Sequence, residues 1–167
     1  MHNELTKKDL ELMQQELDER RLVLRPKLIE AVKEARAFGD LSENFEYKAA
    51  KQEKNRNDSR IRYLESMIKT AVVIGEESRG GGVGLYDKVT VWMEEDEEEA
   101  VFQVVTTVRQ DAGRGLISKE SPFGRALLGK KEGERVYIEV DKTYGYYVQI
   151  RAIQPAGDDG TAPLNRF

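Results

Sequence analysis

Apolar residues recur at alternating steps of three and four along the N-terminal part of the chain. From Thr6 to Phe38 no glycine interrupts them, and Arg21 stands at the one position where the series is broken. The apolar or small positions are Leu10, Met13, Leu17, Leu24, Leu28, Ala31, Ala35 and Phe38. This spacing indicates the narrow stripe of a coiled-coil helix rather than the broad apolar face of a helix on a globular core.

A second series with the same spacing follows a short link. Its positions are Tyr47, Ala50, Lys54, Asn57, Ile61, Leu64 and Ile68. The link reads GDLSENFEY at residues 39–47, hereafter the tip, and so short a connection requires antiparallel neighbours. Folding the chain near residue 41 would place Leu24 opposite Asn57. No later segment has the pattern of another long helix, so we predict a projecting antiparallel coiled-coil hairpin over residues 1–75.

Pro26 breaks the regularity of the first helix. Proline in a helix interior costs about 3 kcal/mol and bends or breaks the helix. Alternatively, the stretch RRLVLRPKL contains a short break, and Pro26 lies in the first turn of a second helical segment. The sequence leaves both interpretations open.

The pattern changes after a glycine-rich stretch, which we assign as a linker over residues 76–86. Four strand-like runs follow, DKVTVWM, AVFQVVTTV, RVYIEV and YGYYVQIRAI. Between the second and third runs, Ser121 is placed to cap a short helix that begins at Pro122 and ends before Gly129. One short helix against a mostly antiparallel sheet predicts a small domain over residues 87–154. The fold class is therefore α+β, and the polar residues 155–167 are predicted to form a disordered tail.

Composition narrows the chemistry that the chain can perform. It has no cysteine and one histidine, His2, which excludes disulfides, thiolate zinc sites and histidine-based triads. The net charge of −4 argues against binding nucleic acid by bulk electrostatics, so such a contact must be local or shared with a partner. No apolar leader and no stretch near the roughly 18 apolar residues of a membrane span is present, so we expect a cytoplasmic protein without membrane contact.

The tip carries three acids, Asp40, Glu43 and Glu46, and the first two admit two interpretations. Asp40 as N-cap with Glu43 three residues later resembles a capping box, in which both side chains serve the second helix. Carboxylates are also the hard oxygen ligands that Mg²⁺ accepts, usually one or two from the protein beside phosphates and water. Two such groups would complete a metal site for which another protein supplies the other ligands. The spacing alone does not decide between these roles.

Two motifs carry a resemblance to a known family. GDLSENFEYKAAKQE at the tip and ISKESPFGRALLGKKEGERV in the second domain resemble the bacterial Gre transcript-cleavage factors, closer to GreA than to GreB, over roughly residues 5–153. The resemblance implies a coiled coil that enters the secondary channel of bacterial RNA polymerase and an FKBP-like domain that docks at the channel rim. It also implies an accessory factor rather than an enzyme, one that stimulates the polymerase's own Mg²⁺-dependent cleavage of backtracked nascent RNA and so rescues arrested complexes.

The resemblance further implies roles for individual residues. Asp40 and Glu43 would hold a Mg²⁺ ion jointly with the polymerase, and the isolated monomeric protein would bind none. The tip would be supported by Leu41, Ser42, Asn44 and Tyr47. Polymerase docking would use Glu120 and Pro122. The nascent RNA 3′ end would be contacted by Lys51, Lys54, Arg56 and Arg60.

One position departs from the family pattern. Phe45 stands beside the tip carboxylates, where the family usually has alanine. This bulky ring supports an alternative function, a Gre-like channel binder that inhibits or regulates the polymerase without stimulating cleavage. A coiled-coil adaptor unrelated to transcription is disfavoured, because both motifs are present.

Overall fold

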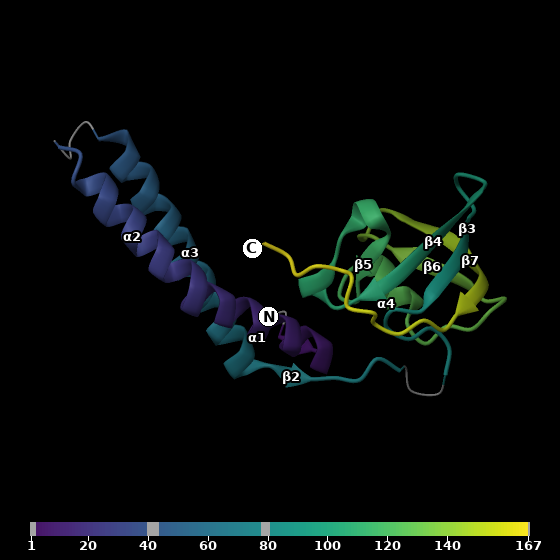
Figure 1. The fold of residues 1–167 in the computed structure, drawn as a ribbon. Coiled ribbons are helices and arrows are strands. Elements are labelled where there is room, and N and C mark those ends of the chain that lie inside the picture. Colours follow the sequence, from purple (N-terminus) through teal and green to yellow (C-terminus); the bar gives the residue numbers. More distant parts are fainter. Residues whose placement is uncertain (1–2, 40–43, 78–80, 167) are drawn as a thin grey trace. The chain divides into compact units, whose positions relative to one another are not determined.

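The computed structural model describes residues 3–39, 44–77 and 81–166, which form two compact units (Figure 1). Residues 10–71 make the hairpin unit, and residues 3–9 together with 72–166 make the sheet unit. The predicted fold class is confirmed, because the first unit consists of paired helices and the second is a small sheet with one short α-helix. The predicted domain boundaries are wrong at both ends of the hairpin, since residues 3–9 and 72–75 belong to the sheet unit. The predicted linker over residues 76–86 is also wrong in part, because Val83, Leu85 and Tyr86 are buried in the core of the sheet unit.

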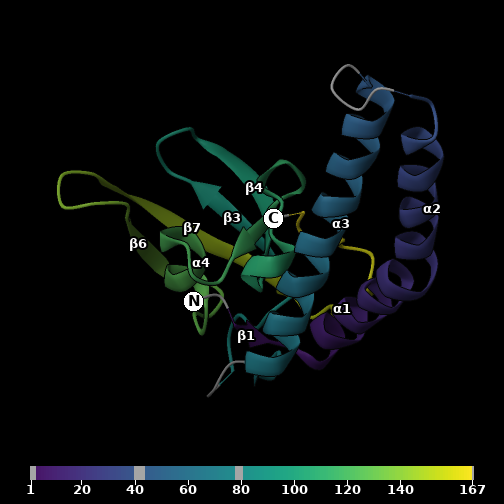
Figure 2. The ribbon, with the colours of Figure 1, turned by 90° about the vertical axis from the view of Figure 1, so that its left-hand side faces the viewer.

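The hairpin is built from three α-helices and a short π-helix. Helix α1 spans Lys7–Glu19, the π-helix Arg20–Leu24, α2 Arg25–Arg36 and α3 Phe45–Thr70. Figure 2 shows α2 and α3 side by side along their length. Most buried positions lie in the predicted stripes, namely Met13, Leu17, Leu28, Ala35, Asn57, Ile61 and Leu64. The stripes are wrong at two places, because Met67 is buried instead of Ile68 and Phe38 is exposed. The predicted antiparallel hairpin is thus confirmed.

The π-helix explains how the first helix accommodates its proline. Pro26 has no N–H and cannot continue the usual ladder of hydrogen bonds. Just before it, the Arg25 N–H donates to the Arg20 carbonyl five residues earlier, which is the π-helical pattern. Pro26 then lies in the first turn of α2. The second interpretation of RRLVLRPKL is correct in placing Pro26 in a first helical turn, but it is wrong in expecting a break, because residues 7–36 stay helical through the π-helical turn.

Asn57, a polar residue in the predicted stripe, is buried through specific hydrogen bonds. Its Oδ1 accepts from Arg20 Nη1 at 2.8 Å, and its Nδ2 donates to the Arg20 carbonyl at 3.3 Å. A buried amide is tolerated only when its polar atoms are paired. The sequence pattern placed Leu24 opposite Asn57 and offered no polar partner for it. The partner is Arg20, in the π-helix.

The sheet unit contains a five-stranded sheet in the order β5-β4-β3-β7-β6. The strands are β3 (Lys88–Met93), β4 (Glu98–Val105), β5 (Leu116–Ser118), β6 (Arg135–Glu139) and β7 (Gly145–Gln154). Neighbours are antiparallel except β4 and β5, which run parallel. Helix α4 (Pro122–Leu127) packs with alternate strand residues in one core. Ser121 caps α4 by accepting from the Gly124 N–H at 3.1 Å, as predicted.

Both ends of the chain join the sheet unit. Strand β1 (Glu4–Leu5) pairs in parallel with β2 (Val72–Val73), and the Leu5 side chain is fully buried. At the other end, Ala162 is buried and the Asn165 N–H donates to the Val108 carbonyl at 2.8 Å. The prediction of a disordered tail is therefore wrong for residues 155–166. Local composition predicted disorder because the partners that order this segment lie far away in the sequence.

Candidate functional site

The second helix of the hairpin is capped by Asn44. Its Oδ1 accepts from the Tyr47 N–H at 2.9 Å, and its Nδ2 donates to the Ala35 carbonyl at 2.7 Å. One side chain thus starts α3 and ties it to the end of α2. The interpretation of Asp40 as the N-cap is wrong, because α3 begins at Phe45, after the whole GDLSEN stretch.

The predicted metal ligands Asp40 and Glu43, with Leu41 and Ser42, lie outside the described residues. The chain approaches them through Gly39, whose φ of 120° is a conformation that side chains disfavour. The predicted supporting residues Asn44 and Tyr47 are both described. Their hydrogen bonds, from Asn44 to the Ala35 carbonyl and from Arg36 to the Tyr47 hydroxyl, link the end of α2 to the start of α3.

Cations surround the aromatic rings at the start of α3. Arg36 Nη2 donates to the Tyr47 hydroxyl at 3.3 Å, and this bond lowers the pKa of Tyr47 from its ordinary value. Lys51 Nζ lies 6.0 Å from the centre of the Tyr47 ring, and Lys48 Nζ lies 5.6 Å from that of Phe45. The side chain of Phe45 is 80% exposed. The start of α3 therefore presents a solvent-exposed ring and positive charge, and it directly follows Asp40 and Glu43 in the sequence.

Two of the four predicted RNA contacts are engaged within the hairpin. Arg60 donates from Nε and Nη2 to the two oxygens of Glu16, at 2.7 and 3.1 Å. Burial opposes ionisation of Glu16, but hydrogen bonds from Arg60 and Arg20 outweigh it and hold its pKa below the ordinary value. Lys54 Nζ lies 2.9 Å from Asp58 Oδ2.

The other two predicted contacts, Lys51 and Arg56, are exposed on α3. They are consequently better placed than Lys54 and Arg60 to meet an external phosphate. Sequence reasoning did not separate these pairs, because Glu16 lies on α1 and is 44 residues from Arg60.

The predicted docking residues lie on the turn that leads into α4. Glu120 is held from inside the unit, since Thr107 Oγ1 donates to its Oε2 at 2.6 Å and Arg125 Nη2 donates to its carbonyl at 2.7 Å. Pro122 is exposed at the first turn of α4. The two residues thus differ. Pro122 offers an exposed apolar surface, whereas Glu120 is half-buried and organises the turn.

A groove beside Pro122 was not foreseen from the sequence. It has a volume of about 580 Å³ and is lined mainly by apolar side chains from β5, α4, β6 and β7. These include Leu116, Ile117, Phe123, Ile138, Val140 and Tyr146. The lining comes from segments spread over more than 30 residues of sequence, so no local motif marks it.

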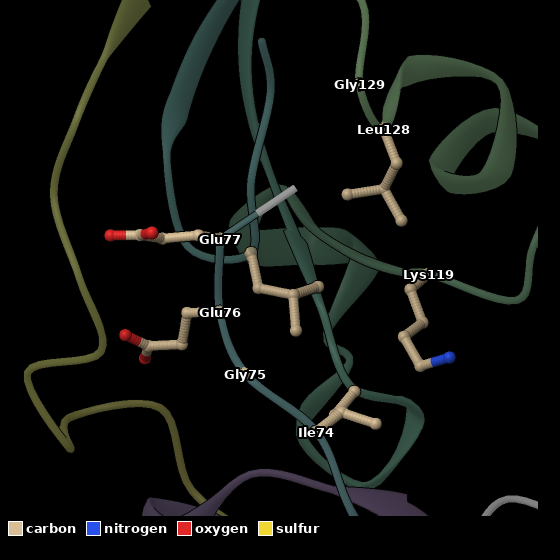
Figure 3. A pocket seen from close by; sticks show the side chains of 8 residues that line it. Ile74, Gly75, Glu76, Glu77, Lys119, Leu128 and Gly129 are labelled. Atoms are coloured by element: carbon tan, nitrogen blue, oxygen red, sulfur yellow. The ribbon is translucent and has the colours of Figure 1, made fainter. Parts of the chain in front are cut away.

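A second, smaller pocket lies on the same unit (Figure 3). It measures about 360 Å³ and is lined by Ile74, Leu85 and Leu128, with Lys119 at its edge. Glu76 and Glu77 point away from it, and Lys119 Nζ pairs with Glu4 Oε2 at 2.7 Å.

Within residues 3–39, 44–77 and 81–166, no group of three or more His, Cys, Asp or Glu side chains is arranged to hold a metal ion. Over the same ranges no helix is long and apolar enough to cross a bilayer.

Two family profiles match the chain over nearly its whole length. The profile described as "Transcription elongation factor, N-terminal" matches residues 3–73, and the one described as "Transcription elongation factor, GreA/GreB, C-term" matches residues 78–155. Both descriptions name a transcription elongation factor. The chain belongs to the GreA/GreB family of these factors, which confirms the resemblance inferred from the two motifs.

Individual relatives place the chain on the GreA side of the family. The transcription elongation factor GreA of Staphylococcus carnosus is 38% identical over 150 residues, covering 90% of this chain and 94% of the relative. GreA of Azorhizobium caulinodans is 44% identical over 131 residues, covering 78% and 83%. Among solved structures, GreA factor homolog 1 of Thermus thermophilus is 28% identical, covers 91% of this chain and 98% of its own, and superposes with a TM-score of 0.41.

Proposed function

We propose that this elongation factor enters the secondary channel of bacterial RNA polymerase with its tip and stimulates cleavage of backtracked nascent RNA. Asp40 and Glu43 would serve as oxygen ligands to a Mg²⁺ ion that the polymerase holds incompletely. In two-metal phosphodiester hydrolysis, such ions activate the attacking water and stabilise the leaving oxygen. The factor contributes carboxylates, and the polymerase performs the reaction in the cytoplasm.

The identity of the helix cap carries this proposal. Asn44 is the N-cap residue of α3, since its Oδ1 accepts from the Tyr47 N–H, and it also binds back to α2, so Asp40 does not occupy the N-cap position. A capping role was the main structural alternative for these two acids. With the cap assigned elsewhere, two carboxylates in a connection between helices are better explained as ligands for a group outside the protein.

We assign contact with the nascent RNA mainly to two exposed cations of α3, Lys51 and Arg56. Lys51 and Arg56 are exposed, whereas Lys54 and Arg60 already neutralise acids of the hairpin. A cation that is not already neutralised by an acid of the protein can neutralise a phosphate of the RNA and release the counterion held there, so it contributes more to binding. We therefore expect Lys51 and Arg56 to supply most of this contact.

Docking on the polymerase is assigned to the turn at Glu120 and Pro122, together with the groove beside Pro122. The exposed ring of Pro122 continues the apolar lining of the groove, and interfaces combine such an apolar centre with a polar rim. Glu120 would supply part of that rim. We expect one copy of the factor to bind each polymerase.

An inhibitory channel binder is the second candidate function. The observation that favours it is Phe45, whose side chain is 80% exposed directly after the carboxylate region. A ring in that place would occupy space beside the acids. Cleavage stimulation and inhibition are separated by one measurement on stalled elongation complexes with end-labelled RNA. Appearance of shortened RNA that is then extended supports the first function, and slowed elongation without shortened RNA supports the second.

The factor alone is expected to cleave no RNA. Two tip carboxylates cannot replace the set of ligands that a catalytic metal pair requires. Labelled RNA incubated with the protein and Mg²⁺ should remain intact, and should shorten only when stalled polymerase is added. Metal-dependent cleavage in the absence of polymerase would show that the chain is itself a nuclease and would overturn its accessory role.

Docking is expected to depend on the charge of Glu120 and the ring of Pro122. Pro122→Ala should weaken polymerase binding by about tenfold, since a contact at an interface centre is worth about 1–2 kcal/mol. Glu120→Arg should weaken it as well, because it reverses a charge at the rim and removes the acceptor of Thr107 Oγ1. Glu120→Gln separates the charge from the turn, because an amide can still accept from Thr107 Oγ1 and preserve the turn, so a loss of affinity in this variant reports the charge itself. Affinity is measured by fluorescence anisotropy. Unchanged affinity of both first variants would place the docking surface elsewhere.

A further inference from the structure

A fully buried arginine joins the two ends of the chain inside the sheet unit. Arg109 lies at the end of a short turn after β4 and is 0% exposed. Its Nη1 donates to Asp9 Oδ1 at 3.0 Å. Both terminal nitrogens donate to Asp158, at 2.6 and 2.7 Å, and Nε donates to the Ala162 carbonyl at 2.6 Å. Residues 9, 109 and 158 are thus linked through one guanidinium.

The Asp9 carboxylate is equally constrained from its own side. Its Oδ2 accepts from the Thr6 N–H at 2.9 Å and from Thr106 Oγ1 at 2.8 Å. The Asp9 N–H in turn donates to Thr6 Oγ1 at 3.2 Å, so Thr6 and Asp9 cap the start of α1 reciprocally. The cap of the helix that continues into the hairpin is therefore also a ligand of Arg109.

The tail, residues 155–166, covers this pair. The family match ends at residue 155, so Asp158, Ala162 and Asn165 lie beyond it. Asn165 Nδ2 donates to the Thr107 carbonyl at 2.9 Å, in addition to the backbone bond to Val108. A methyl group on Gly160 would come within 2.8 Å of Lys8 Cε, which shows that the tail packs directly on residues 3–9. Several independent contacts therefore seat the tail.

We propose that residues 155–166 act as a strap that closes over the Arg109–Asp9 pair and fastens residues 3–9 to the sheet unit. The physical reason is the exclusion of water. An ion pair is strong in a buried, weakly polarisable surrounding and weak once water enters, and a charge left without its partner there is strongly disfavoured. Asp158 supplies the bidentate partner and the tail backbone supplies the cover.

The strap acts where the chain passes from one unit to the other. Residue 9 is the last residue of the N-terminal segment in the sheet unit, and α1 continues from there into the hairpin. The Asp9 carboxylate binds this segment to residues 106 and 109, in addition to the pairing of β1 with β2 and the ion pair between Lys119 and Glu4. Release of the strap would therefore loosen residues 3–9, which include the start of α1, from the rest of the sheet unit.

The test compares Asp158→Asn with Asp159→Asn in the full chain. The Asp159 carboxylate accepts from Thr161 within the tail and interacts with Arg109 only through its charge, so its loss removes a charge and leaves the hydrogen bonds of Arg109 in place. Amide hydrogen exchange is followed by NMR at Asn165, which reports the strap, and at Thr6 and Asp9, which report the N-terminal segment. Asp158→Asn should accelerate exchange at all three by about tenfold or more, because a buried charge loses its bidentate partner. Asp159→Asn should leave Thr6 and Asp9 unchanged.

Three results would overturn the proposal. Unchanged exchange at Asn165 in Asp158→Asn would show that the ion pair does not hold the tail. Fast exchange at Asn165 with unchanged Thr6 and Asp9 would show that the tail does not fasten the N-terminal segment. An equal effect of Asp159→Asn would assign the effect to the turn rather than to Arg109.

A second measurement covers the case in which Asp158→Asn does not fold. Native-state exchange of the wild-type chain in low urea should give one common opening for Asn165, Thr6 and Asp9, at lower free energy than the amides of β3. Separate openings for the tail and for Thr6 would overturn the strap.

Discussion

Asp40→Asn combined with Glu43→Gln is expected to abolish stimulated RNA cleavage while the hairpin remains as stable as in the wild type. The two substitutions keep side-chain size and remove two anionic metal ligands. Loss of ligands to a catalytic ion is worth several kcal/mol of transition-state stabilisation, so the cleavage rate should fall by about a hundredfold or more. The helix should be unaffected because Asn44 caps it.

Glu46→Gln provides the control for this experiment. Glu46 is the third acid of the tip and lies in the first turn of α3, so the substitution removes a negative charge near the same helix start without changing Asp40 or Glu43. Cleavage is measured on stalled complexes, stability by urea unfolding and affinity by competition for polymerase. A double variant that cleaves at the wild-type rate would refute the ligand role. A control that loses as much activity would show that cleavage depends on the general negative charge of the tip rather than on Asp40 and Glu43 as metal ligands.

Gly124→Ala is expected to disrupt α4 and with it the docking of the factor. A Cβ atom at Gly124 would collide with the backbone carbonyl oxygen of Ser118, which cannot move aside as a flexible side chain does. Forcing an extra methyl group into a packed site typically costs about 1–3 kcal/mol. The helix should shift and carry Pro122 with it, so the free energy of unfolding and the affinity for polymerase should both fall.

Gly75→Ala is the matched control, because a Cβ atom there meets nothing within 4 Å and the backbone is not in the left-handed region. Urea unfolding of the two variants gives the stability difference, and anisotropy gives the affinity. If Gly124→Ala binds polymerase as tightly as the wild type despite lower stability, the position of α4 does not matter for docking. The groove beside Pro122 would then have no part in the interface.

Features encoded within a few residues could be predicted from the sequence. The repeated apolar spacing specifies two helices, and the short tip requires them to be antiparallel. Ser121 and Pro122 specify the start of α4, because a cap and a fixed φ act within one turn of helix. The two motifs at the tip and at α4 were sufficient to indicate the family.

The N-cap residue of α3 could not be determined from the neighbouring sequence. Asp40 and Asn44 are both suitable N-cap residues, and either could start a helix. The choice of Asn44 depends on its second bond, to the Ala35 carbonyl on the other helix, which exists only when the hairpin is folded.

The remaining features were decided by the tertiary structure alone. Arg60 pairs with Glu16 over 44 residues, Arg109 with Asp158 over 49 and Arg109 with Asp9 over 100. Periodicity and capping rules relate residues at most a few positions apart, whereas a buried charge is stabilised by whichever partner the fold brings within hydrogen-bond distance. The sequence by itself therefore determined the hairpin, the α+β class and the family. Only the folded chain decided which cations stay exposed on α3 and why a polar tail is ordered, because both depend on charges that meet only after folding.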